Sequence, residues 1–282
     1  MENSNLRNSI AQWLSEDIGD GDHSSLASIS PEAEGKAKLL IKDNGILAGV
    51  RIALVVFSEA DKSLKTELLI PDGSVVKPGD IAFYVSGRGQ SILKSERLVL
   101  NIMQRMSGIA TTTRSYVELL KGLNTKILDT RKTTPGVREL EKEAVRLGGG
   151  FNHRMGLYDM IMLKDNHIDY AGGIKAAIKS TNEYLKTTGR NLKIEIEARN
   201  LPDVREIIET GGVDRIMLDN FSINDTKSAV KIISGRYETE SSGGITFKNI
   251  REYAGCGVDY ISVGALTHHL KSLDMSLKAT TD

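Results

Sequence analysis

Hydrophobic and polar positions follow two different patterns along the chain. In the first hundred residues, the apolar runs at 36–42 and 81–85 predict strands, and the apolar spacing over 50–60 predicts a helix between them. The turn signals that separate these elements are Asn44-Gly45, Pro71-Asp72-Gly73 and Pro78-Gly79. This combination is typical of an α+β domain with antiparallel strand pairing.

A long helical pattern follows this first domain. Apolar residues recur at helical spacing from 91 to 120. Gly108 interrupts this stretch, and glycine weakens a helix interior, so we expect two helices at the boundary between two domains.

The second half of the chain alternates short apolar runs with helical segments. Strands are expected at 126–128, 160–163, 193–196, 215–218, just before Glu238, and at 260–263. Helices are expected at 172–185, 201–210, 224–233, 246–254 and 266–273. Strands that alternate with helices of this length form right-handed βαβ units, and six such units favour a closed (β/α) barrel over an open sheet.

Composition narrows the class of protein further. Of the 282 residues, 37 are Lys or Arg and 37 are Asp or Glu, so the formal net charge is zero and general nucleic-acid binding is not expected. Cys256 is the single cysteine, which excludes an internal disulfide framework and a four-thiolate metal site. The longest apolar run, 52–57, is too short to span a membrane, and residues 1–10 lack the apolar core of a signal peptide. We therefore expect a soluble, cytoplasmic protein.

Polar or glycine residues follow every expected strand of the second half. They are Asp129 to Gly136, Lys164 to His167, Glu197, Asp219-Asn220, Ser241 to Gly244 and Gly264-Ala265. Taken singly, each is explained as a helix cap or a turn. Because the active site of a (β/α) barrel lies where the strands end, and the segments before the strands carry no comparable residues, the series predicts an active site.

Two of these strand ends indicate ligands. The segment 242–244 stands directly before the helix expected at 246–254, in a place where barrels bind phosphate. Glu197 and Asp219 end successive strands and suit Mg²⁺, with the alternative that they cap the helices that follow.

The cationic residues form a larger group than the acids. Arg131, Lys132, Arg154 and Lys164 fall in or beside two strand-end segments, with His153 next to Arg154. Such a cluster suits a dicarboxylate or a phosphate-bearing ligand. The five histidines of the chain lack the paired spacing of a helical zinc site.

Three longer strings are specific enough to indicate a family. They are DTRKTTPG at 129–136, GGGFNHR at 148–154 and LKDNH at 163–167. On these strings the chain resembles the quinolinate phosphoribosyltransferase family, and the resemblance covers most of its length. Further matching strings are 16–22, Glu96-Arg97, 107–111, 194–197, 218–220, 241–244 and 263–267.

The resemblance implies an α/β fold in which an incomplete (β/α) barrel follows an N-terminal α+β sandwich domain. The two domains would span residues 1–110 and 111–265, and a C-terminal helix at 266–282 would pack back on the first domain. It also implies a homodimer, in which the first domain of one subunit covers the barrel mouth of the other. The implied reaction converts quinolinate and phosphoribosyl pyrophosphate into nicotinate mononucleotide, pyrophosphate and CO₂ in NAD biosynthesis, with Mg²⁺ as cofactor.

The resemblance further implies roles for single residues. The quinolinate-binding residues would be Arg97 supplied by the second subunit, Arg131, His153, Arg154 and Lys164, and Thr130 would be a further substrate-binding residue. Lys132, Glu197 and Asp219 would hold Mg²⁺ and phosphoribosyl pyrophosphate, with the two acids as metal ligands. The 5-phosphate would lie on Ser242, Gly243, Gly264 and His268. The catalytic residues would be Lys132, Lys164, Glu197 and Asp219. Glu195 shares a strand face with Glu197, and Glu197 is chosen because it is nearer the strand end.

Three other functions remain open on the sequence alone. Lys164 could form a Schiff base, as in a class I aldolase. A paralogue of the same fold that is associated with molybdenum transport is a second alternative. A phosphate-sensing binding protein is the third, although it would not need the pair Glu197 and Asp219.

Overall fold

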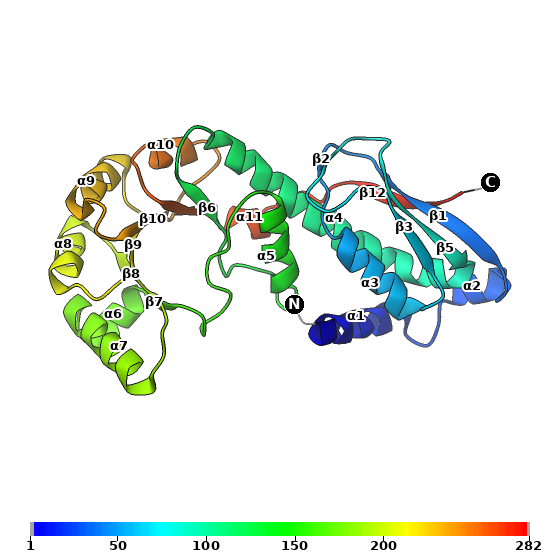
Figure 1. Ribbon diagram of the computed structural model, residues 1–282, viewed down its shortest axis with the longest axis horizontal. Helices are drawn as coiled ribbons and strands as arrows, with labels where there is room; N and C mark the ends of the chain where they lie inside the picture. Colours follow the sequence, from blue (N-terminus) through cyan, green and yellow to red (C-terminus); the bar gives the residue numbers. More distant parts are fainter. Residues whose placement is uncertain (1–2, 281–282) are drawn as a thin grey trace. The chain divides into compact units, whose positions relative to one another are not determined.

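The computed structural model describes residues 3–280, so residues 1, 2, 281 and 282 of the predicted domain ranges lie outside the described residues. The chain divides into two compact units (Figure 1). The amino-terminal unit comprises Met1–Arg114, Arg146–Gly148 and Leu270–Asp282, and the barrel unit comprises Ser115–Val145 and Gly149–His269.

An antiparallel sheet with the strand order β12-β1-β5-β3 forms the centre of the amino-terminal unit. Its strands are β1 (Glu34–Ile41), β3 (Lys65–Leu68), β5 (Ile81–Arg88) and β12 (Met275–Ala279), and a separate pair is formed by β2 (Gly45–Ile46) and β4 (Val75–Val76). The helices are α1 (Asn3–Ile18), α2 (His23–Ser28), α3 (Val50–Ala60) and most of α4 (Gly89–Leu119). Phe57 of α3 and Phe83 of β5 are buried with ring centroids 5.7 Å apart, so the apolar stripe of α3 packs on the sheet and closes the core.

The end of the chain differs from the expected helix. Helix α11 (Ala265–His268) stops after four residues, and β12 then pairs with β1, with Leu277 opposite Leu39. Met275 and Leu277 are buried whereas Ser276 and Lys278 are more exposed, which is the two-residue period of a strand. The prediction of a helix over 266–282 is therefore wrong, since the apolar pairing partner of this segment is a sheet.

The expected break at Gly108 is also wrong, because α4 is one continuous helix of 31 residues. A Cβ atom at position 108 would press on the backbone carbonyl of Lys271 and lie 3.1 Å from the Leu270 Cδ1 atom. This glycine therefore serves a close approach of the returning chain to the helix and does not end the helix.

Six parallel strands form the sheet of the barrel unit, in the order β6-β11-β10-β9-β8-β7 (Figure 1). They are β6 (Lys126–Leu128), β7 (Ile161–Leu163), β8 (Ile194–Ala198), β9 (Arg215–Asp219), β10 (Glu238–Ser242) and β11 (Tyr260–Ser262). Among the described residues β6 and β7 do not pair with each other, so the expected closed barrel is wrong and the incomplete barrel is confirmed.

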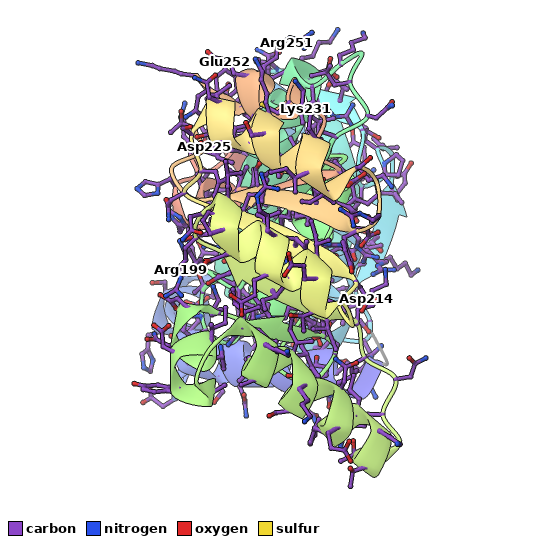
Figure 2. The ribbon with its side chains drawn as sticks, turned by 90° about the vertical axis from the view of Figure 1, so that its left-hand side faces the viewer. Arg199, Asp214, Asp225, Lys231, Arg251 and Glu252 are labelled. Atoms are coloured by element: carbon purple, nitrogen blue, oxygen red, sulfur yellow. The ribbon has the colours of Figure 1, made fainter. Side chains whose placement is uncertain are left out.

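Helices cover the outer side of this sheet. They are α5 (Arg138–Leu147), α6 (Asp165–Ala171), α7 (Ile174–Thr188), α8 (Leu201–Thr210), α9 (Ile223–Ile233) and α10 (Ile250–Ala254). Ile196 and Ile216 of the strands and Ile207 and Ile233 of the helices are fully buried, so the apolar core lies between sheet and helices. Figure 2 shows Asp225 and Lys231 of α9 on the outward, solvated face.

Several boundaries differ from the expected ones in the barrel unit. The helix expected at 246–254 begins only at Ile250, and the strand expected before Glu238 begins at that residue. The helix expected at 172–185 is preceded by the short helix α6, and the two are separated by Gly172, whose φ is +89°. The helix at 201–210 is confirmed as α8. Within residues 3–280, no helix combines the length and apolarity that crossing a membrane requires.

Substitution of Gly108 by alanine tests the close approach of the Lys271 backbone to helix α4. Alanine in a helix interior normally stabilises by about 1 kcal/mol relative to glycine, whereas overpacking costs about 1–3 kcal/mol. We expect Gly108→Ala to lower the free energy of unfolding, measured by denaturant titration. Gly35→Ala is the control, because a Cβ at Gly35 meets nothing within 4 Å. A Gly108→Ala protein at least as stable as the wild type would contradict this account.

Candidate active site

A pocket of about 720 Å³ opens where the strands of the barrel unit end. Of the thirteen site residues that the sequence singled out, it brings twelve together: Thr130, Arg131, Lys132, His153, Arg154, Lys164, Glu197, Asp219, Ser242, Gly243, Gly264 and His268. The thirteenth, Arg97, is exposed on α4 in the amino-terminal unit. The lining also includes Asn220, which the sequence placed at a strand end without a role, and Glu240 and Ser262, which the sequence reasoning did not select.

Glu197 and Asp219 lie at the ends of the neighbouring strands β8 and β9. Glu197 accepts hydrogen bonds from the Lys164 ammonium and, at 3.1 Å, from the backbone N–H of Asp165. Burial, and then the charge of Glu197, raise the pKa of Asp219. Two carboxylates that disfavour each other's charge form an oxygen donor set that suits a divalent cation.

The alternative role of these two acids as helix caps is wrong. Asn200 caps α8, where its side chain accepts from the Asp203 N–H at 2.9 Å. Ser222 caps α9 in the same way, with the Asp225 N–H as donor at 3.1 Å. The carboxylates of Glu197 and Asp219 are thus left for the pocket.

Two glycines of the pocket lining allow close approaches. Gly243 has a φ of +84°, and a side chain there would occupy the place of the Asn220 amide. A Cβ at Gly264 would lie 2.9 Å from His268 Nε2 and 3.2 Å from Lys132 Cδ. Residues 245–249 are not helical, so an anion in this part of the pocket would meet Gly243, Gly264 and Lys132 rather than the start of a long helix.

Local hydrogen bonds fix Lys132 and its loop. The Lys132 N–H donates to Thr130 Oγ1 at 3.0 Å, and Thr267 Oγ1 donates to the Lys132 carbonyl at 2.7 Å. Burial, and then His269 and Lys132, lower the pKa of His268. The loop therefore presents the Lys132 side chain to the pocket while its backbone is held from two sides.

The sequence reasoning missed a buried ion pair behind the pocket, formed by Asp129 and Lys142. The Asp129 carboxylate also accepts from the His153 N–H at 2.8 Å and from Asn152 Nδ2 at 2.6 Å, and Lys142 Nζ donates to the His153 carbonyl at 3.0 Å. The pair therefore fixes the backbone that carries His153 and Arg154. Its signal in the sequence was weak, because the helix that follows Gly136 also buries Glu141 next to Lys142.

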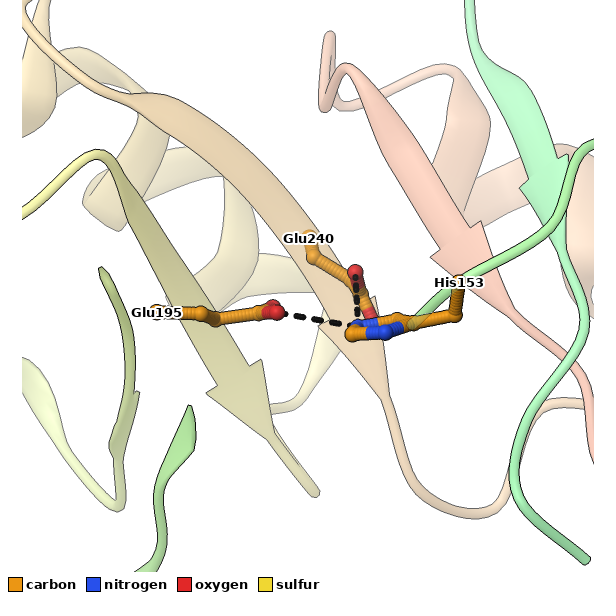
Figure 3. A group of neighbouring side chains, drawn as sticks. All are labelled: His153, Glu195 and Glu240. Carbon is orange, nitrogen blue, oxygen red and sulfur yellow. Dashed lines mark ion pairs between the residues drawn. The ribbon is translucent and has the colours of Figure 1, made fainter. Parts of the chain in front are cut away.

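His153 points into the barrel interior, toward Glu195 and Glu240 (Figure 3). Burial lowers the pKa of His153, but the hydrogen bonds to these carboxylates outweigh it and raise the pKa to about 9. The Nδ1 atom accepts from the Arg154 N–H at 2.6 Å, so the Nε2 atom is the one that faces the carboxylates with a proton. In either protonation state, the Nε2 atom carries a proton between the two carboxylates.

Lys164 does not have the surroundings of a Schiff-base lysine. Its ammonium donates to Glu197, and nearly half of its side chain is exposed. A lysine nucleophile of the aldolase kind is activated in a desolvated pocket or beside another cation. The aldolase alternative therefore has no support in the geometry.

The chain matches two family models in succession: the quinolinate phosphoribosyl transferase N-terminal domain over residues 22–107 and the C-terminal domain over residues 109–278. Quinolinate phosphoribosyltransferase (decarboxylating) 1b of Nicotiana tabacum is 44% identical, over 98% of this chain and 83% of that protein. A probable nicotinate-nucleotide pyrophosphorylase (carboxylating) of Bacillus subtilis is 42% identical, over 99% of this chain and 95% of its own.

Solved structures agree with these relatives. NadC from Streptococcus pyogenes has a TM-score of 0.94 at 38% identity and covers 100% of this chain and 99% of its own. The nicotinate-nucleotide pyrophosphorylase from Francisella tularensis has a TM-score of 0.93 at 38% identity, over 99% of this chain and 98% of its own. Both units of the chain therefore have counterparts of known structure.

Removal of the Lys142 ammonium tests the role of the buried pair. Lys142→Met leaves the Asp129 carboxylate buried without its cation, and we expect a loss of about 3–5 kcal/mol in the free energy of unfolding, measured by denaturant titration. Lys179→Met is the matched control on an exposed position and is expected to change stability by less than about 0.5 kcal/mol. The double variant Asp129→Asn with Lys142→Met should regain part of the loss. Equal stability of Lys142→Met and the control would refute the role of the pair.

Proposed function

Because the chain belongs to the quinolinate phosphoribosyl transferase family, we propose that its barrel pocket converts quinolinate and phosphoribosyl pyrophosphate into nicotinate mononucleotide, pyrophosphate and CO₂. The chain is a decarboxylating quinolinate phosphoribosyltransferase, an enzyme of NAD biosynthesis. The observation that carries the assignment to this pocket is the gathering of eleven family-string residues, and of His268 directly after the last string, around one cavity. The molybdenum-associated paralogue and the phosphate sensor lose their support, since relatives over nearly the whole length carry the transferase name.

Quinolinate has two carboxylates, which calls for fixed cations and hydrogen-bond donors. Arg131 and Arg154 line the pocket from the segments after β6 and before β7, and Lys164 follows β7. Guanidinium groups bind carboxylates through two parallel hydrogen bonds, which orients the ring as well as holding it. Thr130 and His153 add polar contacts at the same side of the cavity.

Mg²⁺ would be held by Glu197 and Asp219, which are hard oxygen ligands on adjacent strands. The raised pKa of Asp219 supports this role, because a cation between the carboxylates would relieve their repulsion. When bound, the ion would neutralise charge on the pyrophosphate group. Lys132 lies next to Gly264 and would add a second cation for the phosphates.

The residues of the pocket contribute to the reaction by position and charge. The pyridine nitrogen attacks the anomeric carbon of the ribose as the bond to pyrophosphate breaks, so the arginines must hold the ring nitrogen toward the sugar. Lys132 and the backbone at Gly243 and Gly264 would hold the phosphates in line with the attack. The bond from C2 to its carboxylate then breaks, CO₂ leaves, and the electron pair on C2 takes up a proton. The quaternised nitrogen stabilises that electron pair.

We further propose a homodimer in which Arg97 of one subunit completes the site of the other. Arg97 supports this, because it is exposed in the amino-terminal unit and belongs to the family strings. Binding to nucleic acid remains unexpected, and a cytoplasmic location stays a prediction.

The activity is tested by release of CO₂ from carboxyl-labelled quinolinate. We expect release only with phosphoribosyl pyrophosphate and Mg²⁺, and loss of turnover after chelation. Lys164→Met should lower turnover by about 100- to 1,000-fold, since it removes a charge at the reacting groups. Lys179→Met should leave turnover unchanged. Absence of CO₂ release from the wild type would overturn the proposed function. A Lys164→Met protein with wild-type turnover would overturn the assignment of the reaction to this pocket.

Mixing of subunits tests the shared site. Arg97→Ala and Glu197→Ala proteins should each be inactive. Equal mixing with subunit exchange should restore about a quarter of the wild-type sites, because half of the dimers are mixed and each mixed dimer has one intact site. The recovered activity is measured as CO₂ release after exchange. Absence of any recovery, with mixed dimers shown by mass, would place Arg97 in the site of its own chain.

A further inference from the structure

A group of three ionisable side chains, His153, Glu195 and Glu240, lies in the interior of the barrel unit (Figure 3). His153 and Glu240 also line the pocket. Glu195 of β8 and Glu240 of β10 are fully buried, and His153 Nε2 lies 2.9 Å from Glu195 Oε2 and 3.4 Å from Glu240 Oε2. The interior of most (β/α) barrels is filled by branched apolar side chains. Because a buried carboxylate is costly without a cation, this group needs a counter-charge.

Arg215, the first residue of β9, supplies that counter-charge. Its Nη1 atom lies 3.0 Å from Glu240 Oε2 and 3.9 Å from Glu195 Oε2. Within residues 3–280, His153, Glu195 and Glu240 form the one group of three potential metal ligands, with donor atoms within 4.8 Å. A metal ion there would stand beside the guanidinium, so the cation of this group is Arg215 itself.

The remaining nitrogen atoms of the Arg215 guanidinium contact residues farther from the pocket, near the starts of the strands. Its Nε and Nη2 atoms lie 3.3 Å and 3.2 Å from Glu238 Oε2, and its Cζ atom lies 4.0 Å from the ring centroid of Tyr260. Since Arg215 does not line the pocket, it can act on a ligand only through the two carboxylates and His153.

We propose that Arg215 is a positioning residue for quinolinate, which cancels the charge of the buried carboxylates that hold His153 at the floor of the pocket. Without the guanidinium, negative charge would remain directly beneath a site for a dianion. The two carboxylates would also compete for the His153 proton without a cation to hold them apart. This inference rests on the proposed function, because it assumes that quinolinate lies on His153.

The two substrates should respond differently. The residues proposed to hold the phosphates, Lys132, Ser242 and Gly264, have no hydrogen bond or ion pair to Glu195 or to Arg215 within the described part of the chain. Loss of the Arg215 charge is therefore expected to weaken quinolinate binding and to leave phosphoribosyl pyrophosphate binding largely intact. General damage to the barrel would affect both substrates.

The test compares Arg215→Met, which loses the charge, with Arg215→Lys, which keeps it. We expect Arg215→Met to raise the KM for quinolinate by about 10- to 100-fold, with the KM for phosphoribosyl pyrophosphate within about twofold of the wild type. The KM of Arg215→Lys for quinolinate should lie closer to the wild-type value. Glu238→Gln is the control, because it removes the outer partner of Arg215 and leaves the inner contacts in place.

A double variant keeps the proposal testable if Arg215→Met folds poorly. Arg215→Met with Glu240→Gln removes one charge of each sign, and we expect a quinolinate KM below that of Arg215→Met, or a folded protein where the single variant is unfolded. Equal rises in both KM values without recovery in the double variant, or an unchanged quinolinate KM in Arg215→Met, would overturn the proposal. CO₂ release by the wild type, measured in parallel, separates these outcomes from failure of the proposed function.

Discussion

A carboxylate that is shut away from water must find a cation or several hydrogen-bond donors, and the architecture of this active site depends on that requirement. Asp129 meets it with Lys142 of α5, the Asn152 amide and the His153 N–H. These donors come from separate segments, so their convergence on one carboxylate determines the path of the chain between α5 and β7. The direction in which Arg154 enters the pocket follows from that path.

Much of the barrel unit could be predicted from the sequence, because its determinants are local. The strand at 126–128 and the helix at 201–210 match β6 and α8, since each has a clear period and a clear end. The site followed from one geometrical fact, that parallel strands end on the same side of a sheet. Most of the residues around the pocket could therefore be expected together, whereas His268 was expected only from the family resemblance.

The wrong predictions of secondary structure have a common physical cause. The residues that decide the local structure there lie far away in the sequence. Gly108 looks like a helix break until the backbone of Lys271 is placed against it. The segment 275–279 becomes a strand because β1 offers it an edge. The strand expected just before Glu238 begins instead at that residue, because β10 pairs with β9 from Glu238 onward, although the two-residue spacing of Glu238, Glu240 and Ser242 carried the signal.

The zero net charge of the chain conceals how its charges are distributed between the solvated helices and the barrel. Four cationic side chains line the pocket, against the acids Glu197, Asp219 and Glu240. Glu197 is paired with Lys164, and Glu240 is paired with Arg215 from below the pocket. Arg131 and Lys132 have no ion-pair partner among the described residues, so their charges remain for anionic substrates. The pocket therefore keeps positive charge for anions because Glu240 is compensated by Arg215 from outside the lining, and because Arg131 and Lys132 have no ion-pair partner among the described residues, not because cations greatly outnumber acids.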